Sequence, residues 1–296
     1  MKVGVVVPQG WTGEYEGVAP ADAWARTVAA ARRADALGFD SIWLFDHMHT
    51  TPEARDIPSF EAFTALAALA PVTERVRLGQ LVTCAGFRNP ALLAKMVSTL
   101  DVAAGGRAEL GIGAGWKQEE WEAYGWGFPS LRDRQRHLRD SLEIITRMLH
   151  QPGRATFSGD TASVAGAINE PRPIQDHLPV MVGGNGRQVT WGIAAQFADE
   201  LNLDNMPAGE WAEARRDLEA RCEEAGRDPG TIRVSVHIWW EALDQAPSRP
   251  DMLRAYADAG IDRVMALVRA AAEDVDELDR FADDCRAAGL ELGSAG

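Results

Sequence analysis

The chain has 296 residues, with 30 lysines and arginines against 44 aspartates and glutamates, so its formal net charge is −14. Its content of 46% hydrophobic and 25% charged residues is ordinary for a folded protein and excludes a disordered or collagen-like chain. Because the negative charge repels phosphate backbones and anionic lipid, and because no run approaches the roughly 20 apolar residues of a membrane span, we predict a cytoplasmic protein without nucleic-acid or membrane partners.

Short apolar runs, typical of buried strands, alternate with helical patterns along the chain. The strands predicted in chain order are residues 3–7, 41–45, 76–82, 109–112, 180–182, 200–203, 232–239 and 263–267. The predicted helices are residues 23–37, 61–70, 90–104, 131–149, 188–197, 210–225, 251–259 and 275–288. Continuous apolar strands joined by helices indicate a parallel sheet that helices cover on both faces.

The segment at about 151–179 interrupts this alternation. It is rich in proline and contains the turn-forming run Ser158-Gly159-Asp160, so we expect an excursion with one short hairpin. Eight strand–helix units in a chain of this length predict a single α/β domain over residues 1–296, a (β/α)8 TIM barrel with its insertion between helix four and strand five. A doubly wound open sheet is the alternative, although such sheets usually have fewer strands.

In a TIM barrel, the functional residues follow the carboxyl ends of the strands. Asp46, His47 and His49 follow the second predicted strand. His47 is the candidate for proton transfer, because imidazole titrates nearest neutral pH. A metal-dependent hydrolase that uses His47, His49 and His237 is an alternative, but the fifth and sixth strands add no imidazole, so we expect no metal site.

A glycine-rich segment leads from the fifth predicted strand into a helix. It consists of Gly183, Gly184, Asn185 and Gly186. Free backbone N–H groups at a helix N-terminus favour an anion, so we predict a phosphate site here, to which Arg187 would add charge. A tight connection without a ligand is the alternative explanation for the glycines.

A second glycine-rich segment, Gly111-Ile112-Gly113-Ala114-Gly115, follows the fourth predicted strand. Its spacing does not match the dinucleotide-binding fingerprint, which also belongs to the first strand–helix turn rather than the fourth. The segment is explained either by a flat ring that packs against the backbone or by the needs of a turn.

Tryptophans gather near the predicted strand ends, among them Trp11, Trp116 and Trp239. An aromatic mouth suits a large planar apolar ligand better than a small polar sugar. Trp191 and Trp211 lie in predicted helices, where packing is the simpler explanation.

Several segments together carry a family resemblance. They are Leu44-Phe45-Asp46-His47, Arg75-Val76-Arg77-Leu78-Gly79 continuing to Arg88-Asn89-Pro90, Glu109 to Trp116, Glu170-Pro171-Arg172-Pro173 and Val182 to Gly186. By their order and spacing, the chain resembles the luciferase-like monooxygenase superfamily of flavin- and deazaflavin-dependent barrel enzymes over essentially its whole length. Within that superfamily it resembles the actinobacterial branch associated with coenzyme F420.

The resemblance implies where the coenzyme would bind. Its ring would lie against strands two to four, with a backbone bulge or a cis peptide bond behind it at Leu81-Val82-Thr83. The segment Gly113-Ala114-Gly115 would line the coenzyme's tail, and Gly183-Gly184-Asn185-Gly186 would receive its phosphate. His47 would donate or accept the proton, and Asp46 would orient His47 or the ring. The resemblance also implies a homodimer.

One departure from the family pattern bears on the substrate. The sugar-phosphate dehydrogenases of the superfamily carry a glutamate directly after the glycines of strand four, where this chain has Trp116 and places Glu119 and Glu120 further on. We therefore do not expect glucose-6-phosphate dehydrogenase activity. We predict F420-dependent hydride transfer to or from a hydrophobic or aromatic small molecule. The alternatives are an FMN-dependent monooxygenase that uses O₂ and a barrel that binds flavin without turnover.

Overall fold

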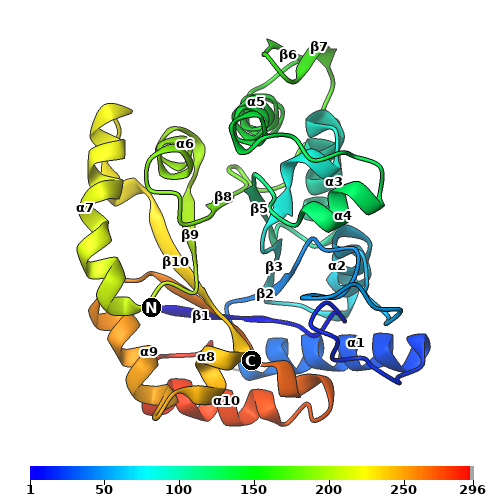
Figure 1. Ribbon diagram of the computed structural model, residues 1–296, viewed down its shortest axis with the longest axis vertical. Helices are drawn as coiled ribbons and strands as arrows, with labels where there is room; N and C mark the ends of the chain where they lie inside the picture. Colours follow the sequence, from blue (N-terminus) through cyan, green and yellow to red (C-terminus); the bar gives the residue numbers. More distant parts are fainter. Residues whose placement is uncertain (294–296) are drawn as a thin grey trace.

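The computed structural model describes residues 1–293, in which eight parallel β-strands close into a barrel (Figure 1). These barrel strands are called staves below, because one of them consists of two consecutive strands, β3 and β4. The staves are β1 (Lys2–Val6), β2 (Ser41–Leu44), β3 (Arg77–Gln80) continued by β4 (Thr83–Cys84), β5 (Ala108–Gly113), β8 (Val180–Gly183), β9 (Glu200–Asp204), β10 (Arg233–Ile238) and β11 (Arg263–Leu267). Neighbours follow the order β3, β2, β1, β11, β10, β9, β8, β5 and β4, and pairing of β3 with β5 closes the ring. The predicted TIM barrel is confirmed, and the open sheet is excluded.

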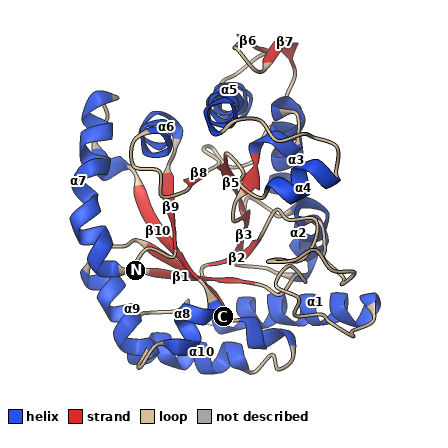
Figure 2. Cartoon of the chain, viewed as in Figure 1, coloured by secondary structure: helices blue, strands red, loops and turns tan. Residues whose placement is uncertain are grey.

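Helices surround the barrel on its outside (Figure 2). Those that the sequence predicts are α1 (Pro20–Leu37), α2 (Ala62–Leu69), α3 (Pro90–Ala103), α5 (Leu131–His150), α6 (Val189–Phe197), α7 (Ala208–Glu224), α9 (Arg249–Asp258) and α10 (Glu277–Ala287). Two short helices, α4 (Gln118–Ala123) and α8 (Trp240–Gln245), were not predicted, because six residues are too few to show a helical period. Within residues 1–293 no helix combines the length and apolarity that crossing a membrane requires.

Local sequence signals explain where the helices begin and end. The Asn89 side chain accepts hydrogen bonds from the first free N–H groups of α3, and Pro90 occupies the first turn, where proline is tolerated. Ser130 caps α5 in the same way through the N–H of Asp133. Helix α1 ends at Gly38, whose φ of 85° lies in the left-handed region that glycine adopts readily.

The insertion forms the expected hairpin, which projects beyond α5 at the top of Figure 1. Its antiparallel strands are β6 (Ala155–Ser158) and β7 (Ser163–Ala167). The turn between them is tied to α5, because the Asp140 carboxylate accepts hydrogen bonds from the backbone N–H and hydroxyl of Thr161 at 2.7 and 2.8 Å.

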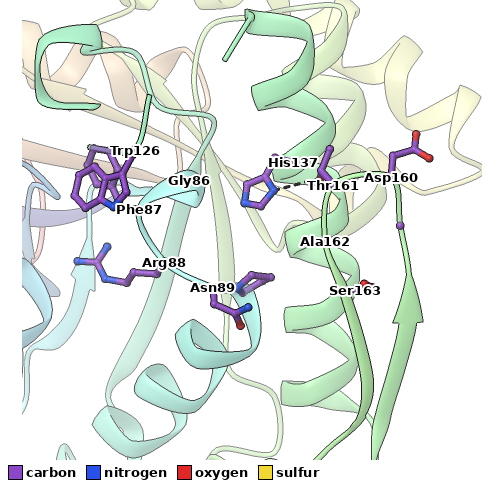
Figure 3. A pocket seen from close by; sticks show the side chains of 12 residues that line it. Gly86, Phe87, Arg88, Asn89, Trp126, His137, Asp160, Thr161, Ala162 and Ser163 are labelled. Carbon is purple, nitrogen blue, oxygen red and sulfur yellow. Dashed lines mark hydrogen bonds between the residues drawn. The ribbon is translucent and has the colours of Figure 1, made fainter. Parts of the chain in front are cut away.

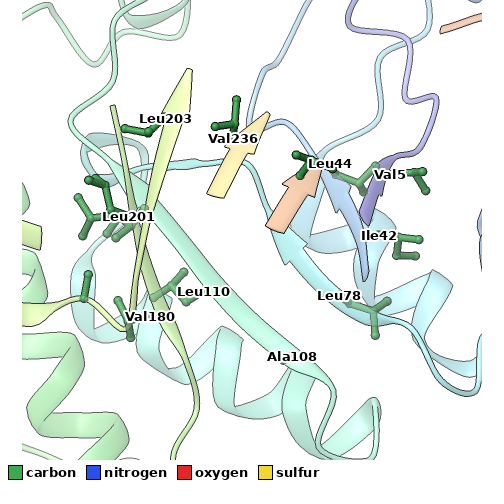
Figure 4. Packing of buried hydrophobic residues seen from close by; sticks show 14 of the residues in the cluster. Val5, Ile42, Leu44, Leu78, Ala108, Leu110, Val180, Leu201, Leu203 and Val236 are labelled. Atoms are coloured by element: carbon green, nitrogen blue, oxygen red, sulfur yellow. The ribbon is translucent and has the colours of Figure 1, made fainter. Parts of the chain in front are cut away.

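Side chains alternate along each stave between the helices outside and the barrel interior. The outward ones form the apolar layer beneath the helices (Figure 4) and include Val5, Ile42, Leu44, Leu78, Leu110, Val180, Leu201 and Val236. The inward ones include polar and charged residues, among them Glu109, Glu200 and Arg263. Because this alternation is strict, the inward positions at the carboxyl ends of the staves all face one space.

An ion cluster and a tryptophan close the interior near the amino ends of the staves. Arg263 donates to Glu109 Oε2 at 3.1 Å and to Glu200 Oε2 at 2.8 Å. Its guanidinium carbon lies 5.4 Å from the centroid of a Trp43 ring, and Trp43 is itself fully buried. Burial raises the pKa of Glu200, and Arg263 opposes that rise.

The glycine at position 111 is required by the close approach of β3. A Cβ atom at Gly111 would lie 2.0 Å from the carbonyl oxygen of Gln80, whereas one at Gly209, on α7, would meet nothing within 4 Å. We expect Gly111→Ala to lower the free energy of unfolding by about 1–3 kcal/mol, as other overpacked cores do. The matched Gly209→Ala is expected to raise it by about 0.4–1 kcal/mol. Urea denaturation measures both, and equal stability of the two variants would contradict this explanation.

Candidate active site

The predicted catalytic, coenzyme-binding and substrate-pocket residues, apart from Arg187, line one cavity of about 400 Å³. They are Trp11, Asp46, His47, Leu81, Val82, Thr83, Gly113, Ala114, Gly115, Trp116, Gly183, Gly184, Asn185, Gly186 and Trp239. They come together because the barrel brings the carboxyl ends of all its parallel staves to one face.

His47 is held by a buried carboxylate on one side and an indole on the other. Its Nδ1 donates to Glu120 Oε2 at 2.7 Å, and the side chain of Glu120 is 0% exposed. The imidazole stacks on Trp11, with ring centroids 4.3 Å apart and an angle of 7° between the planes. Nε2 has no hydrogen-bond partner among the described residues. The ring is therefore fixed in orientation, with one nitrogen free for a ligand.

Glu120 and Asp204 are site residues that the sequence did not predict, and Glu120 is the one that holds His47. Its other oxygen accepts the backbone N–H of Met48 at 2.8 Å, so it holds both the ring of His47 and the loop that carries it. Burial by itself raises the pKa of Glu120, but the hydrogen bond and charge of His47 and the N–H of Met48 bring it below its ordinary value. The carboxylate is therefore ionised. The only sequence signal was an acidic pair, Glu119 and Glu120, shortly after the strand-four glycines.

Asp46 was expected to orient either His47 or the coenzyme ring, and the first of these two roles is wrong. Both of its oxygens accept hydrogen bonds from Arg88, at 2.6 and 2.8 Å, and one also accepts the backbone N–H of Cys84 at 2.9 Å. Asp46 thus ties the loop after β2 to β4. Since Arg88 comes 42 residues later in the chain, local sequence reasoning could not distinguish this role from contact with the neighbouring histidine.

The third stave is interrupted between β3 and β4, where the family resemblance implied a backbone bulge or a cis peptide bond. The peptide bond between Leu81 and Val82 is cis, one of the two forms expected. Val82 then packs against the neighbouring staves, because a Cβ atom at Gly113 or Gly183 would lie 2.9 or 2.8 Å from its methyl groups. The hydroxyl of Thr83 is buried and has no hydrogen-bond partner in the described chain. The glycines at 113 and 183 are therefore explained by protein packing that makes one wall of the cavity.

The segment from Gly183 to Gly186 leads from the end of β8 toward α6, as predicted. Gly184 has a φ of 132°, which a residue with a side chain rarely adopts. The Asn185 side chain exchanges two hydrogen bonds of 2.8 Å with the backbone of Asp204 and so fixes the segment to β9. The expectation for Arg187 is wrong, because its guanidinium pairs with two carboxylates of α7 instead of adding charge at the cavity.

A second histidine–carboxylate pair lies across the cavity, on β9 and β10. The register places His237 opposite Asp204, and His237 Nε2 lies 2.9 Å from Asp204 Oδ1. The other nitrogen of His237 lies 2.9 Å from Asn202 Oδ1. Trp239 Nε1 donates to the same Asp204 oxygen at 2.7 Å.

Aromatic rings form a continuous surface between the two histidines. Trp11 lies 5.4 Å from Trp239, and Phe45 stacks on Trp239 at 5.6 Å with an angle of 7°. Trp116 stands at the rim with 62% of its surface exposed. Trp191 and Trp211 pack against each other between α6 and α7, as expected.

Each of the three histidines of the metal-site alternative makes at least one contact to an oxygen acceptor of the protein. His47 and His237 contact Glu120 and Asp204 respectively, and His49 Nδ1 lies 3.0 Å from the carbonyl oxygen of Thr50. In the part of the chain that the structure describes, no three histidine, cysteine or acidic side chains are arranged to hold a metal ion.

A shallower hollow of about 630 Å³ lies beside the cavity, between the loop before α3 and the turn of the hairpin (Figure 3). It shares only Phe87 with the cavity and contains none of the predicted site residues. His137 lies 3.2 Å from the Thr161 hydroxyl across it. The residues predicted from the sequence therefore lie in the cavity and not in this hollow.

Known proteins resemble this chain in sequence and in fold. The sequence profile of the family described as luciferase-like monooxygenase matches residues 1–287. An uncharacterized protein of Mycobacterium tuberculosis is 30% identical over 80% of this chain and 85% of its own length. The F420-dependent glucose-6-phosphate dehydrogenase of Intrasporangium calvum is 31% identical over 78% of this chain and 73% of its own. An F420-dependent secondary alcohol dehydrogenase, solved with an F420–acetone adduct, shares the fold with a TM-score of 0.80 over 97% of this chain and 98% of that one, at 21% identity.

Proposed function

The chain belongs to the luciferase-like monooxygenase family, and from that premise we propose that it is an oxidoreductase that uses coenzyme F420 to transfer hydride to or from a hydrophobic or aromatic small molecule. The observation that carries the proposal is the cavity itself. Its lining combines glycine-rich backbone around Val82, the aromatic rings of Trp11, Phe45 and Trp239, and a histidine with one free ring nitrogen. Such a slot suits a planar coenzyme with a flat substrate stacked on it.

The residues present fit the coenzyme. The wall around Val82 leaves no side chain at Gly113 or Gly183 to obstruct a ring. The Thr83 hydroxyl and the Trp11 indole N–H are buried cavity-lining groups without partners in residues 1–293, so they are available to a ring's polar edge. The backbone N–H groups at the start of α6 and the side-chain-free Gly184 suit a phosphate. When bound, a deazaflavin would supply hydride transfer at its C5 carbon.

The protein's own contribution is orientation and proton transfer. Glu120 holds Nδ1 of His47, so Nε2 is the atom that donates or accepts the substrate proton. Trp11 keeps the imidazole in one plane by stacking on it. The aromatic surface excludes water from the reacting bond, which strengthens the electrostatic effect of these groups.

The second candidate is an FMN-dependent monooxygenase, which the description of the matching family supports. The same cavity would then hold FMN, and reduced flavin would react with O₂. The residues that face the substrate are the same for both candidates. Identifying the coenzyme that binds therefore distinguishes the F420-dependent enzyme from the FMN-dependent monooxygenase.

Parallel titrations with F420 and FMN test both candidates. We expect the wild type to bind F420 in preference to FMN, and Gly184→Val to weaken that binding by about tenfold or more, because a branched side chain at a φ of 132° strains the segment and obstructs the phosphate. Gly192→Ala, on α6, is the matched control and is expected to bind normally, because a Cβ atom there would meet only Arg221 Cδ, at an ordinary contact distance of 3.9 Å. Fluorescence quenching measures all three affinities.

Each outcome of the titration has a distinct meaning. Preference for FMN, with O₂ consumed on addition of reduced flavin, would replace the first candidate with the second. Failure to bind either coenzyme would overturn both candidates. Unchanged affinity in Gly184→Val would show that the phosphate binds away from the start of α6.

A further inference from the structure

The proton-transfer role of His47 leaves a second polar group in the cavity unused. It consists of Asp204 at the end of β9 with its two donors, His237 and Trp239, which lie 2.9 and 2.7 Å from the same carboxylate oxygen, Oδ1. Oδ2 of Asp204 has no hydrogen-bond partner among the residues that the structure describes. The arrangement therefore holds a carboxylate rigidly while leaving one of its oxygens available.

The carboxylate, and not the imidazole, is the group that this pair presents to a ligand. The side chain of His237 is 12% exposed, against 55% for Asp204. Both ring nitrogens of His237 face acceptors, Asp204 Oδ1 and Asn202 Oδ1. The Asn202 amide nitrogen donates to Ser235 at 3.0 Å, which fixes the amide with its oxygen toward the imidazole.

The carboxylate of Asp204 carries a negative charge, which the neighbouring His237 stabilises. Burial raises the pKa of Asp204, but the hydrogen bonds and charge of His237 and the hydrogen bond of Trp239 bring it below its ordinary value, so the carboxylate is ionised. Of the described residues that line the cavity, Lys117 is the only lysine or arginine, and its Nζ donates to the carbonyl oxygen of Thr50 at 2.7 Å. A phosphate or carboxylate on the substrate would therefore meet no available cation here.

The aromatic surface links this carboxylate to His47. Trp11 stacks on His47 and lies next to Trp239, whose indole N–H in turn contacts Asp204. Phe45 packs on the same face of Trp239. An apolar molecule lying along these rings would have His47 near one end and Asp204 near the other.

We propose that Asp204 determines substrate specificity, by accepting a hydrogen bond at Oδ2 from a hydroxyl or amino group that the substrate carries away from its reacting bond. The inference rests on the proposed function, since it names the chemistry of the substrate for the same cavity. A protonated amine is the best partner, because the hydrogen bond is then charge-assisted. Anionic substrates, phosphorylated sugars included, are disfavoured.

Three probes with a common phenylethyl body test the proposal: phenethylamine, 2-phenylethanol and 3-phenylpropanoate. Binding is followed by the indole N–H resonance of Trp239, identified as the signal missing from Trp239→Phe. We expect the amine to bind at least about tenfold more tightly than the carboxylate, a difference of about 1.4 kcal/mol, and to shift that resonance. In Asp204→Asn the preference is expected to fall to about threefold or less, because the amide places a donor where Oδ2 accepted.

Asp217→Asn is the matched control, since it removes the same charge from the exposed face of α7 and is expected to keep the wild-type preference. An unchanged preference in Asp204→Asn, tightest binding of the carboxylate, or no shift of the Trp239 resonance with any probe would overturn the proposal. The titrations are done with and without coenzyme. If the protein preferred the amine but bound no coenzyme, the result would count against the proposed function alone. If it bound the coenzyme but showed no preference for the amine, the result would count against the specificity role of Asp204 alone.

Discussion

Replacing His47 with alanine is expected to lower turnover by about 10²–10⁴, the usual contribution of a positioned acid or base, while leaving coenzyme affinity within a few-fold. The reason is geometric, because His47 offers one free ring nitrogen to the cavity while Glu120 and Trp11 hold the rest of the ring. The measurement is single-turnover oxidation of reduced coenzyme with the best substrate found in a panel of hydrophobic and aromatic compounds.

Two further variants separate proton transfer from structural disturbance. Glu120→Gln keeps an acceptor for the N–H of Met48 but removes the charge beside His47, so we expect a smaller loss of turnover, by about tenfold. His137→Ala, in the neighbouring hollow, is expected to leave turnover unchanged. Added imidazole should partly restore His47→Ala. Wild-type turnover in His47→Ala would remove this residue from the mechanism.

Replacing Arg263 with methionine is expected to lower the free energy of unfolding by about 3–5 kcal/mol, because removing one partner of a buried ion cluster leaves the remaining charges uncompensated. Arg263 is 1% exposed and binds Glu109 and Glu200 inside the barrel. With Arg263 gone, only the charge of Arg233 and the hydrogen bond of Ser235 oppose the effect of burial, so the pKa of Glu200 rises further. The folded variant then binds a proton that the unfolded chain releases, so the loss of stability is expected to be larger at about pH 8 than at about pH 5.

Urea unfolding measures this effect, and two controls guard its interpretation. Arg280→Met removes an exposed arginine from α10 and is expected to change stability by less than about 0.5 kcal/mol. Adding Glu200→Gln to Arg263→Met should recover part of the loss, because it removes a buried carboxylate that has lost its buried partner and keeps only the half-exposed Arg233. If Arg263→Met were as stable as the wild type at both pH values, the ion cluster would not stabilise the fold.

Most of the barrel could be predicted because its signals are local. Apolar runs such as Val180–Gly183 identify strands by themselves, and caps such as Asn89 and Gly38 mark where helices begin and end. Once the staves are ordered around a barrel, the carboxyl ends of distant strands must share one face. The predicted site residues therefore line one cavity although they are spread from Trp11 to Trp239.

The pairing of side chains within that cavity could not be predicted in the same way. His47 and Glu120 are 73 residues apart, and α4, which carries Glu120, is too short to show a period. Whether Asp46 contacts its neighbour His47 or the more distant Arg88 depends on how two loops pack. No short stretch of sequence around Asp46 indicates that packing. The sequence by itself determined the elements, the barrel and the face that holds the site. Only the tertiary structure decided which carboxylate holds which histidine, because those contacts form between strands and loops that barrel closure brings together.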